Sequence, residues 1–257
     1  MSRNCINEST MKLPKSLENE PLVDAVFEVR FRDAPPLADI LPGALFGALK
    51  PISGIQRLPA AAVPFPLRVH DPALKFAPLL RLEVENFFVS VGDSSVVLSC
   101  KLPYPKWPKF KEFIKQISDE MLKIDVPANV ERYALKYVNL IQNPLISEQL
   151  QKIRTSIRLG DVEVKNEQIS LQVHHNEGNI LHIMSVMTGA QGKLPDNTDV
   201  FGTVVDIDSI VLVDNMSFRA FVDIIDKDVE SLRQANKAKF FSCITSEAIQ
   251  EMGPTYE

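Results

Sequence analysis

Hydrophobic and polar residues alternate from Leu22 to Phe31, where every second side chain is apolar. This two-residue period is typical of a strand that buries one face. Apolar residues at helical spacing over residues 37–50, and again from Trp107 to Asp125, predict two amphipathic helices. Further alternating or β-branched runs predict strands at residues 80–91, 96–100, 130–141, 162–164, 169–175, 179–187 and 200–213.

Proline and glycine positions mark the connections between these elements. Five prolines from Pro59 to Pro78 remove backbone hydrogen-bond donors, which predicts an extended loop or an edge segment there. The turn-forming residues 92–95 separate two strand candidates at a spacing that predicts a hairpin.

The last predicted element is the longest. Apolar residues keep a helical period from Phe218 over more than thirty residues, as far as Gly253 and Pro254. Ser217 precedes this stretch directly, and a serine side chain can accept a hydrogen bond from the first helical turn. Acidic residues lie early and basic residues late, an order that suits the helix dipole. The pattern predicts a long C-terminal helix capped by Ser217.

The order of elements predicts an α+β protein in which amphipathic helices cover an antiparallel β-sheet. Residues 1–20 are polar and predict a disordered tail. Residues 21–143 and 144–257 form two loosely similar halves, each with antiparallel strands and a closing helix. We expect one continuous sheet to run through both halves, and a single sheet that grips the long C-terminal helix is the alternative.

Composition narrows the class of protein. The 257 residues are 45% hydrophobic and 24% charged, as in globular proteins with a large core. The net charge of -5 argues against a general nucleic-acid binder. The chain has neither an apolar run of about 18 residues nor the apolar core of a secretory signal. We expect a cytoplasmic protein that binds neither nucleic acid nor membranes.

Motifs for cofactors and catalysis are missing from the sequence. The three cysteines, Cys5, Cys100 and Cys243, are widely spaced, which argues against a disulfide framework or a zinc site. The chain also lacks a G-x-S-x-G elbow, a phosphate-binding P-loop, a dinucleotide-binding G-x-G-x-x-G and an H-E-x-x-H pair. We therefore expect no cofactor, and we favour a non-enzymatic protein over an enzyme.

Asp206 and Asp208 form the most distinctive acidic pair. Two positions apart on a predicted strand, their carboxylates would lie on one side, where oxygen ligands could converge on Mg²⁺ or Mn²⁺. No further ligand occurs at a metal-site spacing, so the two residues remain candidates and no metal site is assigned. Carboxylates that face solvent opposite Val205 and Ile207 are the simpler interpretation.

A second candidate site lies in the basic and aromatic segment Lys101–Lys111. Lysines interleaved with aromatic residues can bind nucleic acid, but the acidic chain argues against it. Trp107, flanked by prolines, could instead form a rigid anchor for a protein partner. We assign Trp107, Lys106 and Lys109 as candidate partner-binding residues.

Acidic residues gather in the second half of the sequence. Between Asp196 and Glu230 the chain carries nine carboxylates and only two basic residues. If these carboxylates cluster in space, they would attract a cation or a basic partner surface.

Four segments resemble a sporadically distributed family of uncharacterised bacterial proteins. They are residues 21–31, PLVDAVFEVRF; residues 133–139, YALKYVN; residues 206–208, DID; and residues 238–245, AKFFSCIT. The family carries no activity to transfer. The resemblance implies a bacterial cytoplasmic protein, and the patchy distribution of the family implies an accessory gene such as a defence or toxin-neutralising system.

The sequence leaves three functions open. The first is a non-enzymatic protein-binding factor of the immunity, antitoxin or defence kind, which acts on a protein partner or as a homodimer. The second is a small-molecule binder with an apolar cavity between the sheet and the long helix. The third is a metal-dependent hydrolase that uses Asp206 and Asp208. We rank them in that order.

Overall fold

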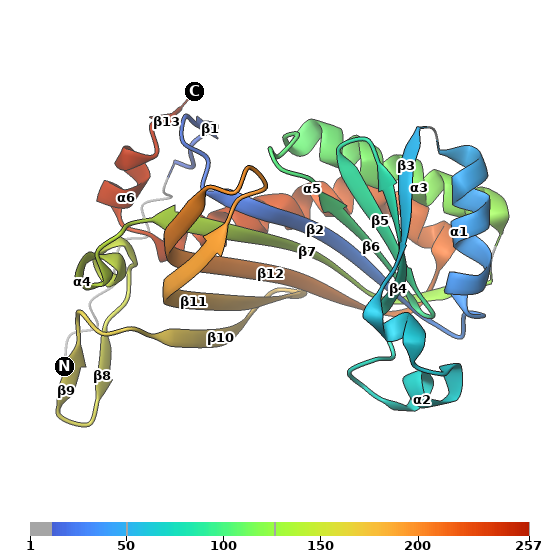
Figure 1. The fold of residues 1–257 in the computed structure, drawn as a ribbon, viewed down its shortest axis with the longest axis horizontal. Coiled ribbons are helices and arrows are strands. Elements are labelled where there is room, and N and C mark those ends of the chain that lie inside the picture. The colour runs from blue at the N-terminus through green and yellow to red at the C-terminus, as the bar shows by residue number, and fades with distance from the viewer. Residues whose placement is uncertain (1–11, 50, 126, 257) are drawn as a thin grey trace.

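Within residues 12–49, 51–125 and 127–256, which the computed structural model describes, nine strands form one antiparallel sheet (Figure 1). Their order is β10-β11-β12-β7-β2-β6-β5-β4-β3. The predicted α+β class with an antiparallel sheet is confirmed. The strands are β2 (Leu22–Arg32), β3 (Ile52–Arg57), β4 (Pro78–Val84), β5 (Phe87–Gly92), β6 (Ser95–Cys100), β7 (Asn129–Gln142), β10 (Ser170–Glu177), β11 (Ile180–Lys193) and β12 (Asp199–Ser217).

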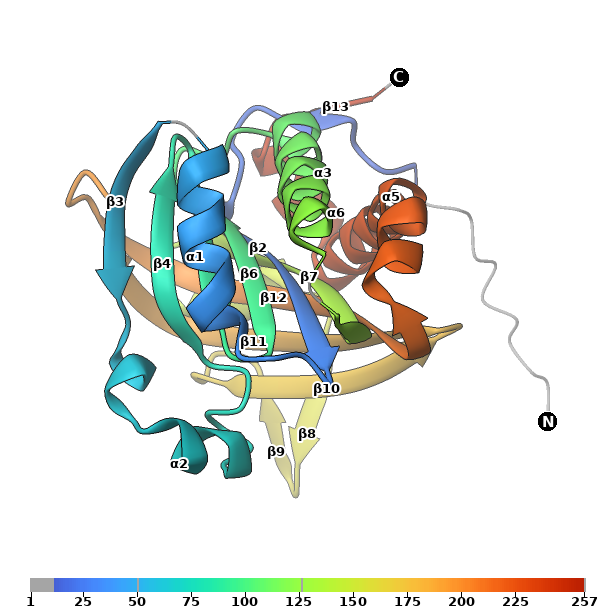
Figure 2. The ribbon, with the colours of Figure 1, turned by 90° about the vertical axis from the view of Figure 1, so that its right-hand side faces the viewer.

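Three long helices of the described chain lie on one face of this sheet (Figure 2). They are α1 (Leu37–Ala48), α3 (Trp107–Ile124) and α5 (Phe218–Cys243). The short elements are η1 (Pro59–Ala62), α2 (Phe65–His70), α4 (Ile146–Gln149), η2 (Leu150–Lys152) and α6 (Ser246–Glu251), with the small strand pairs β1 (Ser16–Leu17) with β13 (Pro254–Thr255) and β8 (Ile157–Leu159) with β9 (Val162–Val164).

The two halves of the sequence share one core. Alternate residues of β2, such as Phe27, are buried beneath the helices, as the two-residue period predicts. Phe221 and Val229 of α5 belong to the same buried cluster, although α5 comes from the second half. The sheet is also continuous across the seam, because β7 pairs with β2 on one side and with β12 on the other. The expected continuous sheet is thus confirmed.

Asn236 fixes α5 against the sheet. Its Nδ2 atom donates towards the carbonyl oxygens of Leu135 at 3.1 Å and Ile207 at 2.8 Å, one on β7 and one on β12. The same atom lies 2.9 Å from Ser209 Oγ, which in turn lies 2.9 Å from Nδ1 of the buried His182. This buried polar network sets the position of α5 along the two central strands.

The long C-terminal helix ends earlier than the apolar period predicts. Ser217 caps it as expected, since Ser217 Oγ accepts from the N–H of Ala220 at 3.2 Å. The helix stops at Cys243, and the side chain of Thr245 caps the separate helix α6. The backbone of this break bonds elsewhere, because Cys243 O accepts from Arg154 N and Thr245 N donates to Lys152 O. Tertiary hydrogen bonds therefore interrupt a helix that the local pattern would continue.

The proline-rich segment and the following strand also differ from prediction. Residues 59–78 contain η1 and α2 rather than only an extended loop, and prolines occupy the first turns of both helices. The run 80–91, predicted as one strand, is two strands, β4 and β5. Glu85, at a positive φ of 48°, lies in the tight turn between them. A polar two-residue turn interrupts the alternation of apolar and polar residues only briefly. The sequence pattern therefore does not distinguish two strands from one.

The described part of the predicted N-terminal tail packs on the fold. Residues 1–11 lie outside the described residues. From residue 12 onward the chain departs from the expected disorder. Strand β1 pairs with β13, and Leu17 packs against a second buried apolar cluster that includes Phe240 and Ile244. The backbone partners of β1 lie at the far end of the sequence, so the local polar composition could not reveal them.

No helix within the described residues combines the length and the apolar character needed to cross a membrane.

Because both halves share one core, we predict that truncation of Phe221 strongly destabilises the protein. This side chain is fully buried between Tyr133, at a ring-centroid distance of 5.2 Å, and Phe218. We expect Phe221→Ala to lower the free energy of unfolding by about 3–5 kcal/mol, because it removes a buried ring and leaves a cavity. Urea denaturation measures the effect. Ile224→Ala, on the exposed side of the same helix, is the matched control and should cost about 0.5 kcal/mol or less.

Candidate functional site

Asp206 and Asp208 lie on one side of β12, as predicted, and on the sheet face opposite the three long helices. Each carboxylate faces a cation of β7. Asp206 Oδ2 lies 2.7 Å from Lys136 Nζ, and Asp208 Oδ2 lies 3.8 Å from Arg132 Nη2. Arg132 is also 3.0 Å from Glu28 on β2. The described residues contain no group of three or more His, Cys, Asp or Glu side chains that could hold a metal ion.

The carboxylates of this sheet face are partly desolvated. Burial raises the pKa of Asp208 to about 6, and the nearby Arg132 guanidinium opposes that rise only in part. One oxygen each of Asp206 and Asp208, and the Nε of Arg132, are buried without a hydrogen-bond partner. The arrangement is a row of alternating charges across neighbouring strands, in which the carboxylates serve as counter-ions of the basic side chains.

Trp107 connects two helices. It is half-buried at the start of α3, and its indole N–H donates to Glu230 Oε2 on α5 at 2.9 Å. Lys106 Nζ lies 2.7 Å from Glu20, whereas Lys109 is exposed. The structure thus gives Trp107 a role in packing α3 on α5, and partner binding by these three residues stays a prediction.

The acidic residues of segment 196–230 do not form one cluster. Asp206 and Asp208 lie on the helix-free face of the sheet. Asp226 and Glu230 lie on α5, on the other face, where both contact Lys111. The carboxylates that are close in sequence are therefore divided between the two sides of the sheet.

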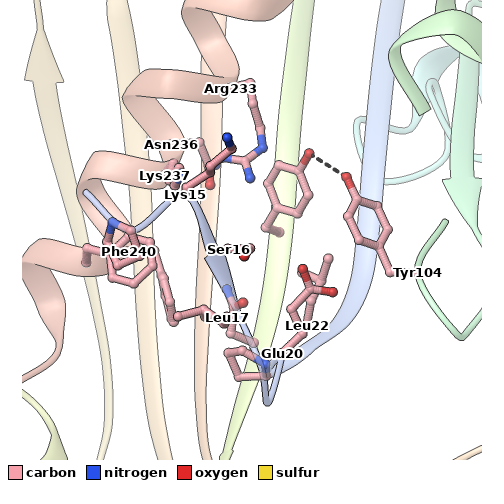
Figure 3. Close-up of a pocket in the computed structure, with 15 residues that line it drawn as sticks. Lys15, Ser16, Leu17, Glu20, Leu22, Tyr104, Arg233, Asn236, Lys237 and Phe240 are labelled. Atoms are coloured by element: carbon pink, nitrogen blue, oxygen red, sulfur yellow. Dashed lines mark hydrogen bonds between the residues drawn. The ribbon is translucent and has the colours of Figure 1, made fainter. Parts of the chain in front are cut away.

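A pocket between α5, the start of β2 and the N-terminal segment gathers basic and hydroxyl side chains (Figure 3). We call it the cationic pocket. Its cavity has a volume of about 80 Å³, room for a few water molecules or one small anion. The pocket is lined by Pro14, Lys15, Ser16, Leu17, Glu20, Pro21, Leu22, Tyr104, Tyr137, Asn139, Arg233, Asn236, Lys237, Phe240 and Phe241.

Two cations of the pocket, Arg233 and Lys237, come from successive turns of α5 and are half-buried. The Arg233 guanidinium lies 5.0 Å from the ring centroid of Tyr137 and 5.9 Å from that of Trp107. Its Nε is buried without a hydrogen-bond partner. Burial and the charge of Arg233 lower the pKa of Lys237. Across the described chain, neither Arg233 nor Lys237 forms an ion pair with a carboxylate.

The opposite wall of the pocket carries two phenol groups. Tyr104 and Tyr137 have their hydroxyl oxygens 3.2 Å apart. Burial raises the pKa of Tyr104, and it raises that of Tyr137 to about 12, so both hydroxyls stay protonated near neutral pH. The carboxylate of Glu20 lies at the other end of the pocket from Arg233 (Figure 3), and Lys106 binds it at 2.7 Å. The Arg233 end is therefore rich in hydrogen-bond donors.

This donor set suits an oxyanion. Guanidinium and ammonium groups form short, charge-assisted hydrogen bonds to carboxylate and phosphate oxygens, and buried hydroxyls can add neutral donors. Lys15 from the N-terminal segment lines the same pocket (Figure 3). The pocket can thus bind a small negatively charged group.

Sequence reasoning missed this pocket. The sequence shows the basic residues late in α5, but their position was explained by a favourable interaction with the helix dipole. Tyr104 and Tyr137 are 33 positions apart, and Lys15 falls in a segment predicted to be a disordered tail. A signal existed in the spacing of Arg233 and Lys237, because like charges four residues apart on a helix repel each other and call for an explanation.

An apolar cavity between the sheet and α5 was one expectation from the sequence, and large aromatic side chains occupy much of that interface. Phe218, Phe221 and Phe240 are all buried there. A second cavity adjoins the cationic pocket and shares Glu20, Pro21, Leu22 and Tyr104 with it. Most of its lining is apolar, with Val23, Leu102, Pro103, Leu140, Leu194 and Pro195 among the contributors.

The raised pKa of Asp208 predicts a pH-dependent stability. The folded protein holds the Asp208 proton more tightly than the unfolded chain, whose aspartates have a pKa of about 3.9. The free energy of unfolding should therefore fall as the pH rises from about 4 through 6. As the pH rises over this range, the free energy of unfolding of Asp208→Asn should increase by up to about 3 kcal/mol relative to that of the native protein. Urea denaturation at several pH values measures this.

Asp223→Asn, an exposed position on α5, controls for the loss of one negative charge. If the stability difference between Asp208→Asn and the native protein does not vary with pH, the pKa of Asp208 is not raised in the folded protein.

Comparison with known proteins gives no relative from which a function could be transferred. No family model matches the chain, and no curated protein matches it. The functional interpretation therefore depends on the geometry of the cationic pocket and on the charges that surround it. The physical chemistry of Arg233, Lys237 and the two tyrosine hydroxyls is the evidence that carries it.

Proposed function

We propose that this protein binds a small oxyanion, a phosphate or carboxylate group, in the cationic pocket. The observation that carries the proposal is the pair Arg233 and Lys237: two half-buried cations, one helical turn apart, that lack a carboxylate counter-ion in the described chain. An anion placed between them would supply the missing charge. The tyrosine hydroxyls on the opposite wall would help to orient it.

The energetics support a ligand. Like charges at this helical spacing destabilise a helix by about 0.2–0.5 kcal/mol, and partial burial adds a desolvation cost. Without a ligand, the folded protein would be more stable if one of these two charges were removed. A bound anion would offset both costs, because it adds an attractive contact to each cation and stabilises the folded state by mass action.

The lining favours binding over catalysis. Within the described residues that line the pocket, histidine and cysteine are absent, and the carboxylate present, Glu20, is engaged by Lys106. This proposal retains the small-molecule binder inferred from the sequence, with charge in place of apolar surface. The family resemblance of the sequence supports a bacterial cytoplasmic setting. A role in defence or toxin neutralisation would then act through a small anionic ligand.

Oxyanion binding can be tested by isothermal titration calorimetry with inorganic phosphate and, separately, with acetate. We expect saturable binding of at least one of them at the native pocket. Arg233→Gln and Lys237→Gln should each weaken it about 10- to 100-fold, since a charged hydrogen bond contributes about 1.5–3 kcal/mol. The two titrations distinguish a phosphate site from a carboxylate site.

Lys227→Gln is the matched control for these variants. Lys227 is exposed on the same helix, and its replacement by glutamine changes the net charge by the same amount. The Lys227→Gln variant should bind the anion with the affinity of the native protein. Equal weakening in Lys227→Gln would mean that the overall charge of α5, and not the pocket, attracts the anion.

The unliganded protein should become more stable when one cation is removed. We expect Lys237→Gln to raise the free energy of unfolding in anion-free buffer by about 0.2–0.5 kcal/mol, because it ends the repulsion from Arg233. The same variant should lose the rise in melting temperature that the bound anion causes in the native protein. A Lys237→Gln variant that is less stable than the native protein in anion-free buffer would show that Lys237 has a stabilising partner in the fold.

A further inference from the structure

The outer side of β10 is an open sheet edge. All eight residues of this strand are exposed, and within the described chain only β11 pairs with it. The hairpin turn has two residues, so Glu177 and Ile180 exchange backbone hydrogen bonds. Alternate residues therefore point their N–H and C=O groups away from β11. These are Ser170, Gln172, His174 and Asn176.

This edge lacks the features that normally prevent strand pairing. Exposed edges usually carry proline, lysine or a bulge, or are very short. The sequence of β10, SLQVHHNE, contains neither proline nor lysine. Its pairing with β11 is regular along all eight residues, so it has no bulge. Its sole carboxylate, Glu177, is at the end of the strand and contacts Lys239 of α5. The opposite sheet edge, β3, is shorter and has a bulge between Ile52 and Gly54.

The same edge also carries exposed apolar residues. Leu171 and Val173 are 38% and 42% exposed on β10. The β8–β9 hairpin projects beyond the sheet beside one end of β10 (Figure 1), and it carries Leu159 at 77% and Val162 at 52% exposure. Large apolar side chains this exposed mark contact surfaces when they occur together.

We propose that β10 pairs in antiparallel fashion with β10 of a second copy of this chain. A second β10 fits this edge because the strand can pair with itself. An antiparallel register that places Val173 opposite Val173 of the second copy pairs Gln172 with His174 and Ser170 with Asn176. This register uses every outward backbone group, and it brings no two like charges into opposition. Val173 then occupies a non-hydrogen-bonded position, where facing side chains approach most closely.

A two-fold contact also closes the assembly. Each copy would use the same edge, so the dimer would contain one continuous sheet of twice nine strands and leave only the bulged β3 edges at its ends. A contact from β10 to β3 would instead propagate without limit. The β8–β9 hairpins, one from each copy, would flank the new strand pair and cover Leu159 and Val162. The proposal is independent of the cationic pocket, which lies on other elements.

Sedimentation equilibrium of the full chain tests this pairing. The native protein should have about twice the chain mass of 28.8 kDa. His174→Pro removes an outward N–H and leaves the hydrogen bonds to β11 intact, since proline is tolerated at an edge position of this kind. We expect it to raise the dimer dissociation constant at least tenfold, with an unchanged far-ultraviolet circular dichroism spectrum.

Ile55→Pro is the matched control on the other sheet edge. Leu58 N bonds to Leu79 O, so the alternation of the β3–β4 pair points the N–H of Ile55 to solvent. This variant should remain dimeric. A native protein that is monomeric at every concentration, or a His174→Pro variant that dimerises as tightly as the native protein, would overturn the proposal.

Charge substitutions at the two-fold position keep the proposal testable if His174→Pro fails to fold. V173K and V173E should each be monomeric, because identical charges would meet across the axis. An equimolar mixture of the two should recover the dimer mass. A mixture that stays monomeric, or single variants that stay dimeric, would show that two β10 strands do not face each other.

Discussion

The fold depends on the burial of α5 across β7 and β12. Phe221, Ile225, Val229 and Leu232 present one apolar stripe to the sheet, and Asn236 bonds to carbonyl oxygens of both strands. Because β7 belongs to the first half of the sequence and β12 to the second, this single helix joins both halves into one core. The position of α5 along the sheet is then fixed by polar contacts as well as by packing.

The cationic pocket is a consequence of this placement. Arg233 and Lys237 lie on the side of α5 that faces the start of β2, next to the residue that anchors the helix. The N-terminal segment crosses this gap because β1 pairs with β13 near the end of the chain. Tyr104 completes the wall by reaching Tyr137 on β7. The pocket thus forms where four distant segments meet, at the boundary of the core where polar groups can be partly buried without being fully covered.

The two faces of the sheet treat charge differently. On the helix-free face, Asp206, Asp208 and Glu28 alternate with Arg132 and Lys136, so the charges compensate each other across neighbouring strands. On the helix face, the charges of Arg233 and Lys237 have no such compensation in the described chain. The first arrangement is typical of a structural network, and the second is the observation from which we propose anion binding. The acidic residues that dominate the second half of the sequence are therefore divided between these two environments.

The sequence by itself determined the elements whose period is regular and long. The alternation in β2, the apolar stripe of α3 and the start of α5 at Ser217 were all readable, because burial of one face imposes a local period. It also determined the α+β class and the shared side of Asp206 and Asp208. Only the tertiary structure decided where α5 ends, whether residues 12–20 are ordered, and which side chains form the pocket. Those outcomes depend on hydrogen bonds and contacts between residues far apart in the chain, such as Ser16 with Thr255 and Tyr104 with Tyr137, and no local pattern encodes them.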